Sequence, residues 1–124
     1  MIAAEPAAAD DCAQSLAAGR IIPNKSPPDV LTIVDGVRVT LGDKCWLVIQ
    51  QYVDHVITVS EEQIASAMRV VWERMKLVIE PLAAVPVAVV LYKGEEVKKK
   101  YPNLKNIGIV LCGGNVDLNK LPWM

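Results

Sequence analysis

The chain has 124 residues, of which 52% are hydrophobic, and a formal net charge of −1. This length suits a small globular protein with one core, and the near-neutral charge provides no electrostatic footprint for nucleic acid. Three cysteines without paired spacing fit a reducing compartment better than a disulfide framework. Length and composition therefore favour a cytoplasmic, globular protein with one core.

Two segments bear on targeting and on membranes. Residues 1–4 meet Glu5 and a proline at once, so we expect no secretory leader. The longest apolar run, residues 77–92, is interrupted by Glu80 and by prolines, whereas a helix that crosses a bilayer needs about 20 apolar residues. We therefore expect no membrane-spanning segment.

The first half of the chain alternates predicted strands and helices, as in an α/β domain. The expected elements are a strand at residues 1–4, a helix from Asp10 or Asp11 to Ala18, an extended connector at 21–30, a helix at 42–53 and a strand at 55–59. Asp10 or Asp11 is a typical N-cap for the first helix, and Gly19 is a typical C-cap.

The second half begins with Ser60 and Gln63, whose spacing predicts a capping box at the start of a helix. At helical spacing the side chains expected to face inward are Ile64, Met68, Val71, Met75 and Val78. Pro81 ends this helix or starts the next, an apolar helix at 83–92. Pro86 fits that helix if it occupies the first turn, where a missing N–H costs nothing. A short charged helix or turn follows residues 93–94.

The apolar run 107–111 predicts a buried strand that opens directly into Gly113 and Gly114. In open α/β sheets, ligands bind beyond the carboxyl ends of strands, and glycine lets the backbone approach a ligand closely. Cys112, Gly113, Gly114 and Asn115 are therefore candidates for the wall of a ligand site. A glycine pair alone is a weak signal, because most such pairs are ordinary turns.

A resemblance to a known family extends over nearly the whole chain. It is carried, in matching order, by residues 4–12 (AEPAAADDC), 35–37 (DGV), 71–76 (VWERMK), 79–81 (IEP) and 111–118 (LCGGNVDL). These segments resemble the C-terminal part of the serine racemases, fold-type II pyridoxal-phosphate enzymes related to the serine and threonine dehydratases. The resemblance implies an α/β fold, with an open and mostly parallel sheet flanked by helices. Residues 1–124 would be the C-terminal portion of a tryptophan synthase beta-like domain, hence an incomplete one.

The resemblance implies an enzyme that interconverts L- and D-serine and eliminates water from serine to give pyruvate and ammonia. In that family the lysine that holds the cofactor and the phosphate loop lie upstream of the matched part, so we expect no catalytic residue here and no activity from this chain alone. The expected partners are serine and a second subunit, in a homodimer or with a full-length subunit. Two alternatives stay open: a non-catalytic short product that binds full-length subunits, and a module that binds only a divalent cation or a nucleotide.

By the resemblance, pyridoxal 5'-phosphate contacts residues from three places. Cys112 pairs with the ring nitrogen, Gly113 adjoins it, Glu80 lies near the ring, and Gly36 belongs to a loop beside the substrate with Asp35. Taken by itself, Cys112 is a small buried hydrophobe and Glu80 a solvated helix cap. Racemases usually carry serine where this chain has Cys112, which tilts the expectation slightly toward elimination.

An acidic turn near the N-terminus is a candidate cation site. Glu5 and Asp11 flank Ala9 at a strand-to-helix turn, where two carboxylates could hold a hard divalent cation. Helix capping is the alternative explanation for the same residues. The resemblance implies Mg²⁺ or Ca²⁺, bound by the side chains of Glu5 and Asp11 and by the backbone carbonyl of Ala9.

Residues 74–76 have two interpretations. From the sequence pattern, Arg74 and Lys76 lie on the solvated side of an amphipathic helix. The resemblance implies instead that Arg74, Met75, Lys76 and Asn115 contact ATP, an activator whose phosphates suit a guanidinium and an ammonium group.

Overall fold

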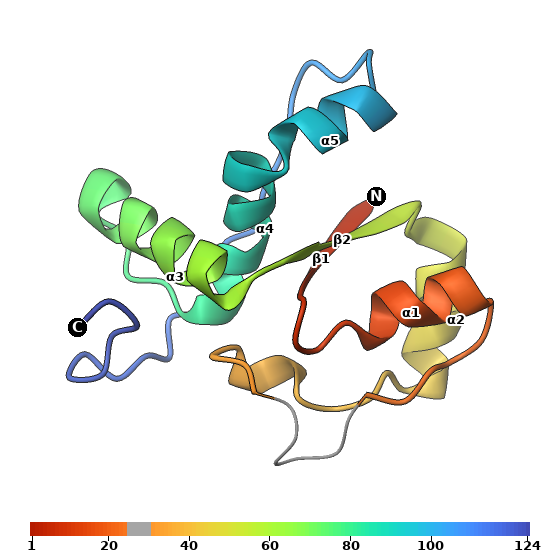
Figure 1. The fold of residues 1–124 in the computed structure, drawn as a ribbon, viewed down its shortest axis with the longest axis horizontal. Helices are drawn as coiled ribbons and strands as arrows, with labels where there is room; N and C mark the ends of the chain where they lie inside the picture. Colours follow the sequence, from red (N-terminus) through yellow and green to blue (C-terminus); the bar gives the residue numbers. More distant parts are fainter. Residues whose placement is uncertain (25–30) are drawn as a thin grey trace. The chain divides into compact units, whose positions relative to one another are not determined.

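The structure is a computed structural model that describes residues 1–24 and 31–124. The chain divides into two compact units, Met1–Glu61 and Glu62–Met124. Most of the connector predicted at 21–30 lies outside the described residues. The α/β class is confirmed, since strands alternate with helices along the first unit and helices dominate the second (Figure 1).

The first unit is built on a two-stranded parallel sheet of β1 (Ile2–Pro6) and β2 (His55–Val59). Ile2 lies opposite His55 and Pro6 opposite Val59. The predicted strands are confirmed. A parallel pair needs a long crossover, and here the intervening chain carries α1 (Asp11–Ala18), the short 3₁₀ turn η1 (Asp35–Val37) and α2 (Asp43–Tyr52).

The helix ends of this unit follow local chemistry. Gly19 ends α1 with φ of 68°, the left-handed conformation that glycine adopts without strain, so its predicted role as C-cap is confirmed. Asp10 stands at the N-cap but makes no side-chain capping hydrogen bond. The buried hydrophobic residues of this unit are Ala9, Cys12, Val34, Trp46, Val56, Ile57 and Val59.

All but the first residue of α3 (Glu61–Val70) belongs to the second unit, and the helix continues into a five-residue π-helical turn, η2 (Val71–Met75). Ile64, Met68 and Val71 are buried, as predicted. The same prediction is wrong for Met75 and Val78, which are 56% and 58% exposed. The reason is local: the wider π turn breaks the 3.6-residue period, and Lys76 ends the helix with a φ of 59°.

Two further helices follow, α4 (Pro81–Tyr92) and α5 (Gly94–Lys100). Pro81 starts α4 at the position where proline is best tolerated. The expectation that Pro86 lies in the first turn is therefore wrong, because Pro86 lies inside the helix. The buried residues of α4 are small or β-branched: Ala83, Ala84, Val85, Ala88 and Val89. The short charged helix predicted after residue 94 is confirmed as α5.

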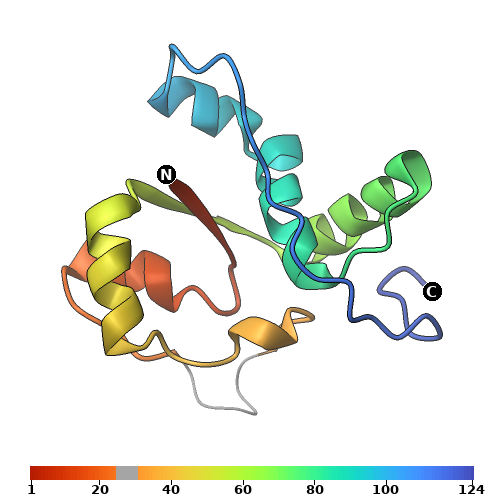
Figure 2. The ribbon, with the colours of Figure 1, turned by 180° about the vertical axis from the view of Figure 1, so that it is seen from behind.

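The predicted buried strand at 107–111 is wrong. After α5 the chain is extended and returns to the start of α4 (Figure 2). Ile107 is 51% exposed and Val110 80% exposed. Among the described residues only β1 and β2 pair as strands, so this run has no neighbouring strand to satisfy its backbone or cover its side chains.

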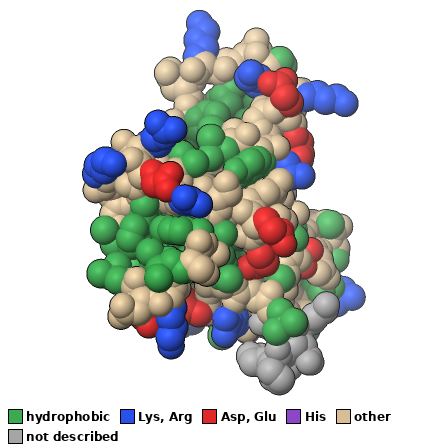
Figure 3. All heavy atoms as spheres, turned by 60° about the vertical axis from the view of Figure 1, so that its left-hand side comes forward, with side chains coloured by type: hydrophobic (Ala, Val, Ile, Leu, Met, Phe, Trp, Pro, Cys, Tyr) green, Lys and Arg blue, Asp and Glu red, His purple; other side chains and the backbone are tan. Residues whose placement is uncertain are grey.

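The second unit exposes many large apolar side chains. They are Val70, Met75, Leu77, Val78, Leu91, Tyr92, Leu104, Ile107, Val110, Leu118 and Met124. Figure 3 shows one face of the molecule on which hydrophobic side chains gather. Within the described ranges, no helix is both long and apolar enough to cross a bilayer.

Candidate functional site

Glu80 and the glycine turn that follows residue 111 are in direct contact within the second unit. The backbone N–H of Glu80 donates to the carbonyl oxygen of Gly113 at 3.1 Å. The backbone N–H of Asn115 donates to Oε2 of Glu80 at 2.9 Å. Gly113 has a φ of 105°, and a Cβ atom there would lie 2.4 Å from Cδ of Glu80. The turn is therefore shaped around this carboxylate, and only glycine fits at position 113.

Cys112, which directly precedes Gly113, is an exposed free cysteine, so its thiol is accessible. The expectation of a buried small hydrophobe at this position is not met. A Cβ atom at Gly114 would lie 3.1 Å from the carbonyl oxygen of Val78, so this second glycine also allows a close backbone approach. The accessible thiol of Cys112 can hydrogen-bond a ring nitrogen, and the glycines carry no side chain beside it, so these residues are compatible with the ring side of pyridoxal 5'-phosphate.

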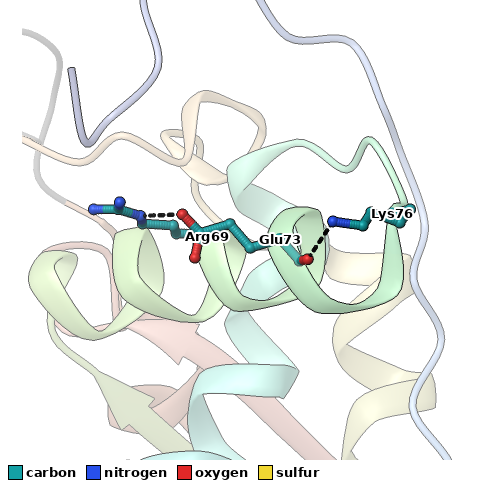
Figure 4. A network of polar contacts seen from close by, with 3 residues as sticks. All are labelled: Arg69, Glu73 and Lys76. Atoms are coloured by element: carbon teal, nitrogen blue, oxygen red, sulfur yellow. Dashed lines mark hydrogen bonds and ion pairs between the residues drawn. The ribbon is translucent and has the colours of Figure 1, made fainter.

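The turn at residues 74–76 is organised by Glu73. Its carboxylate accepts from Nε of Arg69 at 2.7 Å, and its backbone carbonyl accepts from Nζ of Lys76 at 2.7 Å (Figure 4). The hydrogen bond from Arg69, helped by nearby positive charge, holds the pKa of Glu73 below its usual range. The ion pair is half exposed, so it stabilises the turn only weakly. In this arrangement the ammonium group of Lys76 caps the end of the helix.

In the first unit, the three residues predicted to bind a cation lie around the β1–α1 turn. The carboxylate of Glu5 accepts from the backbone N–H groups of Cys12 at 3.2 Å and of Ala13 at 2.9 Å. Oδ2 of the buried Asp11 accepts from the backbone N–H of Leu41 at 2.9 Å. Glu5 thus performs the capping of α1 that the sequence assigned to Asp10 or Asp11.

The electrostatics of this turn are unfavourable for negative charge. The pKa of Glu5 is raised to about 7, chiefly by burial and to a smaller extent by the neighbouring Asp11 and Asp10, in spite of its two backbone hydrogen bonds. Burial, together with Glu5 and Asp11, raises the pKa of the Cys12 thiol to about 11. The carboxylates of Glu5 and Asp11 and the backbone carbonyl of the buried Ala9 offer only oxygen donors, the kind that Mg²⁺ and Ca²⁺ prefer. The residues therefore fit a hard cation.

The loop that carries Asp35 and Gly36 is held at its base, while both residues are exposed. Nη2 of Arg38 donates to the carbonyl oxygen of Thr32 at 2.6 Å, and Val34 is fully buried. Oε2 of Glu61 accepts from the backbone N–H of Ile33 at 2.8 Å. Loop residues on such a tied base are suited to positioning a ligand.

The structure joins some predicted residues and leaves others in separate units. Glu80, Gly113 and Asn115 are bonded together, and residues 74–76 belong to the same unit. Gly36 and the acidic turn belong to the first unit. The sequence prediction missed Trp72, whose indole Nε1 donates to the carbonyl oxygen of Ile79 at 2.9 Å. It also missed Glu61, and no sequence spacing signals either contact.

Known proteins similar to this chain identify its family. The family described as "Pyridoxal-phosphate dependent enzyme" matches residues 1–113. Serine racemase of Rattus norvegicus is 50% identical over 98% of this chain and 35% of the relative. Beta-hydroxyaspartate dehydratase of Paracoccus denitrificans is 40% identical over 99% of this chain and 36% of the relative.

Among solved structures, maize serine racemase superimposes with a TM-score of 0.86 at 42% identity, over 95% of this chain and 35% of that protein. The chain thus spans about a third of the length of the relatives it matches. One family model matches most of the chain, and the similarity extends to both sequence and fold. This chain belongs to the pyridoxal-phosphate dependent enzymes, as part of their fold-type II α/β architecture.

Proposed function

We propose that this chain is the C-terminal part of a racemase and ammonia-lyase that acts on serine with pyridoxal 5'-phosphate. The observation that carries the proposal is the 50% identity to a serine racemase over 98% of the chain. Because the chain spans 35% of that relative, residues 1–124 would be one portion of the cofactor domain. Activity would then require the remaining portion.

In this proposal the chain supplies one side of the cofactor pocket. The cofactor, when bound, supplies the electron sink for removal of the serine α-proton. The thiol of Cys112 faces the ring nitrogen, Gly113 allows close approach, and Glu80 keeps the glycine turn in shape. Gly36, with Asp35, adjoins the substrate from the loop anchored by Glu61.

Two further ligands are proposed on the same residues as in the sequence analysis. Mg²⁺ or Ca²⁺ binds Glu5, Asp11 and the carbonyl of Ala9, and steadies the β1–α1 turn. The desolvated carboxylate of Glu5 supports this assignment, because a cation offsets its burial. ATP acts as an activator and contacts Arg74, Met75, Lys76 and Asn115. The complete enzyme is a homodimer in the cytoplasm.

A chimera tests the catalytic proposal. The 124-residue chain, incubated with pyridoxal 5'-phosphate and L-serine, should yield neither D-serine nor pyruvate. Fused behind the upstream region of maize serine racemase, it should yield both, whereas the upstream region alone should not. Turnover by the isolated chain, or an inactive but folded chimera, would show the proposal to be wrong.

A second candidate function is a non-catalytic short product that binds full-length subunits. It is favoured by the exposed apolar side chains of the second unit, including Ile107, Val110 and Leu118. Mixing the chain with full-length rat serine racemase should then give a mixed complex in size-exclusion chromatography with a changed serine turnover. If the chain instead binds Mg²⁺ or ATP but neither cofactor nor subunit, it is a simple binding module.

A further inference from the structure

The indole of Trp72 closes the segment that carries the proposed nucleotide residues. Its Nε1 donates to the carbonyl oxygen of Ile79 at 2.9 Å. This bond ties the second residue of the π-helical turn to the residue just before Glu80. Residues 74–76, which complete this turn and lead out of it, therefore lie in a loop between Trp72 and Ile79 that a single side chain closes.

The bond is partly shielded from water. Ile79 is 4% exposed, and the ring of Trp123 packs edge-on against Trp72 with centroids 5.5 Å apart and planes at 78°. Edge-to-face aromatic contact adds stability beyond its buried area, and a shielded hydrogen bond is stronger than an exposed one. The Ile79 carbonyl, if deprived of this donor, would be a buried acceptor without a partner.

Residues 77 and 78, between Lys76 and Ile79, are only weakly held by packing. Leu77 is 45% exposed and Val78 58% exposed. Lys76 has a positive φ of 59°, which is uncommon for a residue other than glycine and costs energy. Its ammonium group donates to the Glu73 carbonyl, and a phosphate would compete with that carbonyl for the ammonium group. The loop is thus strained at a residue that an anionic ligand would engage.

Beyond Ile79, the chain passes directly to the contacts that hold the glycine turn. Glu80 donates its N–H to Gly113 and accepts the N–H of Asn115 on Oε2. A shift of the Ile79 peptide therefore moves the Glu80 backbone and the carboxylate above Gly113. Within the described residues, the indole bond is the one side-chain hydrogen bond to Ile79 that precedes these contacts.

We propose that Trp72 is a positioning residue that couples the loop of residues 74–76 to Glu80, so that a nucleotide on the loop changes how Glu80 is held over Gly113. The inference rests on the nucleotide role proposed above. In this account Trp72 contacts neither the nucleotide nor the cofactor, and it acts through the carbonyl of Ile79.

Amide hydrogen exchange of the 124-residue chain, followed by NMR without ligand, tests the positioning. Trp72→Phe keeps a ring against Trp123 but removes the N–H donor. Loss of one net hydrogen bond should speed exchange at the Glu80 and Asn115 amides by about three- to tenfold. Trp123→Phe is the matched control, because the Trp123 indole makes no hydrogen bond within the described ranges. Unchanged exchange in Trp72→Phe, or equal acceleration in the control, would overturn the assignment.

Titration with Mg–ATP tests the coupling. In the native chain, amide resonances of residues 74–76 and of Glu80 should both shift, and in Trp72→Phe only the former should. Equal shifts at Glu80 in both would overturn the coupling through Trp72, because the ligand would then act directly through Asn115. Shifts confined to residues 74–76 in the native chain would overturn the coupling alone, whereas no shift anywhere would overturn the nucleotide site as well.

A folding control completes the design. Amides of β1 and β2 lie in the other unit and should exchange as in the native chain. If Trp72→Phe prevents folding, replacing the indole of Trp72 by a benzothiophene keeps the bicyclic shape and removes only the N–H. The same two measurements then decide the proposal.

Discussion

The carboxylate of Glu80 occupies the space that a side chain at position 113 would need. A Cβ atom on Gly113 would lie 2.4 Å from both Cδ and Oε1 of Glu80 and 2.8 Å from Oε2. The backbone groups of the two residues are also bonded, through the Glu80 N–H and the Gly113 carbonyl. The geometry of the glycine turn and the orientation of this carboxylate therefore depend on each other.

Gly113→Ala should destabilise the second unit by about 2 kcal/mol or more, because it adds a clash to the cost of a positive φ. Urea denaturation followed by Trp72 and Trp123 fluorescence, in a Trp46→Phe background if needed, would measure the change. Gly108→Ala is the matched control, since a Cβ atom at Gly108 would have no atom within 4 Å and the φ of Gly108 is not positive. A similar loss in both variants would contradict the close contact with Glu80.

Combining Gly113→Ala with Glu80→Ala should show positive coupling between the two positions. Once the Glu80 carboxylate is removed, the alanine at 113 meets no carboxylate, and only the φ cost of about 1–2 kcal/mol remains. The double-mutant cycle from denaturation free energies should therefore give a rescue of about 1 kcal/mol or more. Strict additivity of the two substitutions would show that the residues are not in contact.

Pro86→Ala should stabilise α4. Proline at this position provides no N–H for the carbonyl of Leu82 one turn earlier, and proline inside a helix costs about 3 kcal/mol. Because the substitution also removes apolar atoms from a half-buried site, we expect a net gain of about 1–2 kcal/mol. Pro81→Ala, at the first position of the same helix, should change stability little. Thermal unfolding monitored by circular dichroism would compare them.

The stability of the first unit should fall as the pH rises toward neutrality. Burial raises the pKa of Glu5 to about 7, so the folded chain binds its proton more tightly than the unfolded chain, whose Glu5 pKa is the ordinary 4.5. This contribution is fully present below the unfolded value and is lost as the pH rises through the folded one. The difference in thermal midpoint between native chain and Glu5→Gln should therefore change between about pH 4.5 and 8. The exposed Glu95→Gln should show no such trend.

A divalent cation should restore the stability that the first unit loses on going to about pH 7.5. Mg²⁺ or Ca²⁺ at about ten times its dissociation constant should stabilise the first unit by about 1.4 kcal/mol. Glu5→Gln and Asp11→Asn should each remove the effect, while Asp43→Asn, in the first turn of α2, should retain it. Isothermal titration calorimetry would measure the affinity directly, and equal binding by Glu5→Gln would exclude the proposed site.

The sequence predicted the local elements well where local chemistry decides them. β1, β2, α2 and α5 were all predicted near their observed bounds, because alternation and helical period are written into consecutive residues. Gly19 was recognised as a C-cap since only its own φ is involved. The prediction failed where the backbone departs from a regular period, at the π turn before Lys76, which left Met75 and Val78 on the surface.

The sequence by itself determined the alternation of strands and helices, the glycine turn and, through its resemblance, the family. Only the tertiary structure decided that Glu80 lies over Gly113, that Glu5 rather than Asp10 caps α1, and that residues 107–111 form no strand. These contacts join residues 7 to 35 positions apart, as in the bonds of Glu5 with Cys12 and of Asn115 with Glu80. Propensity and periodicity act over a few residues, so pairing at such separations depends on how the chain packs.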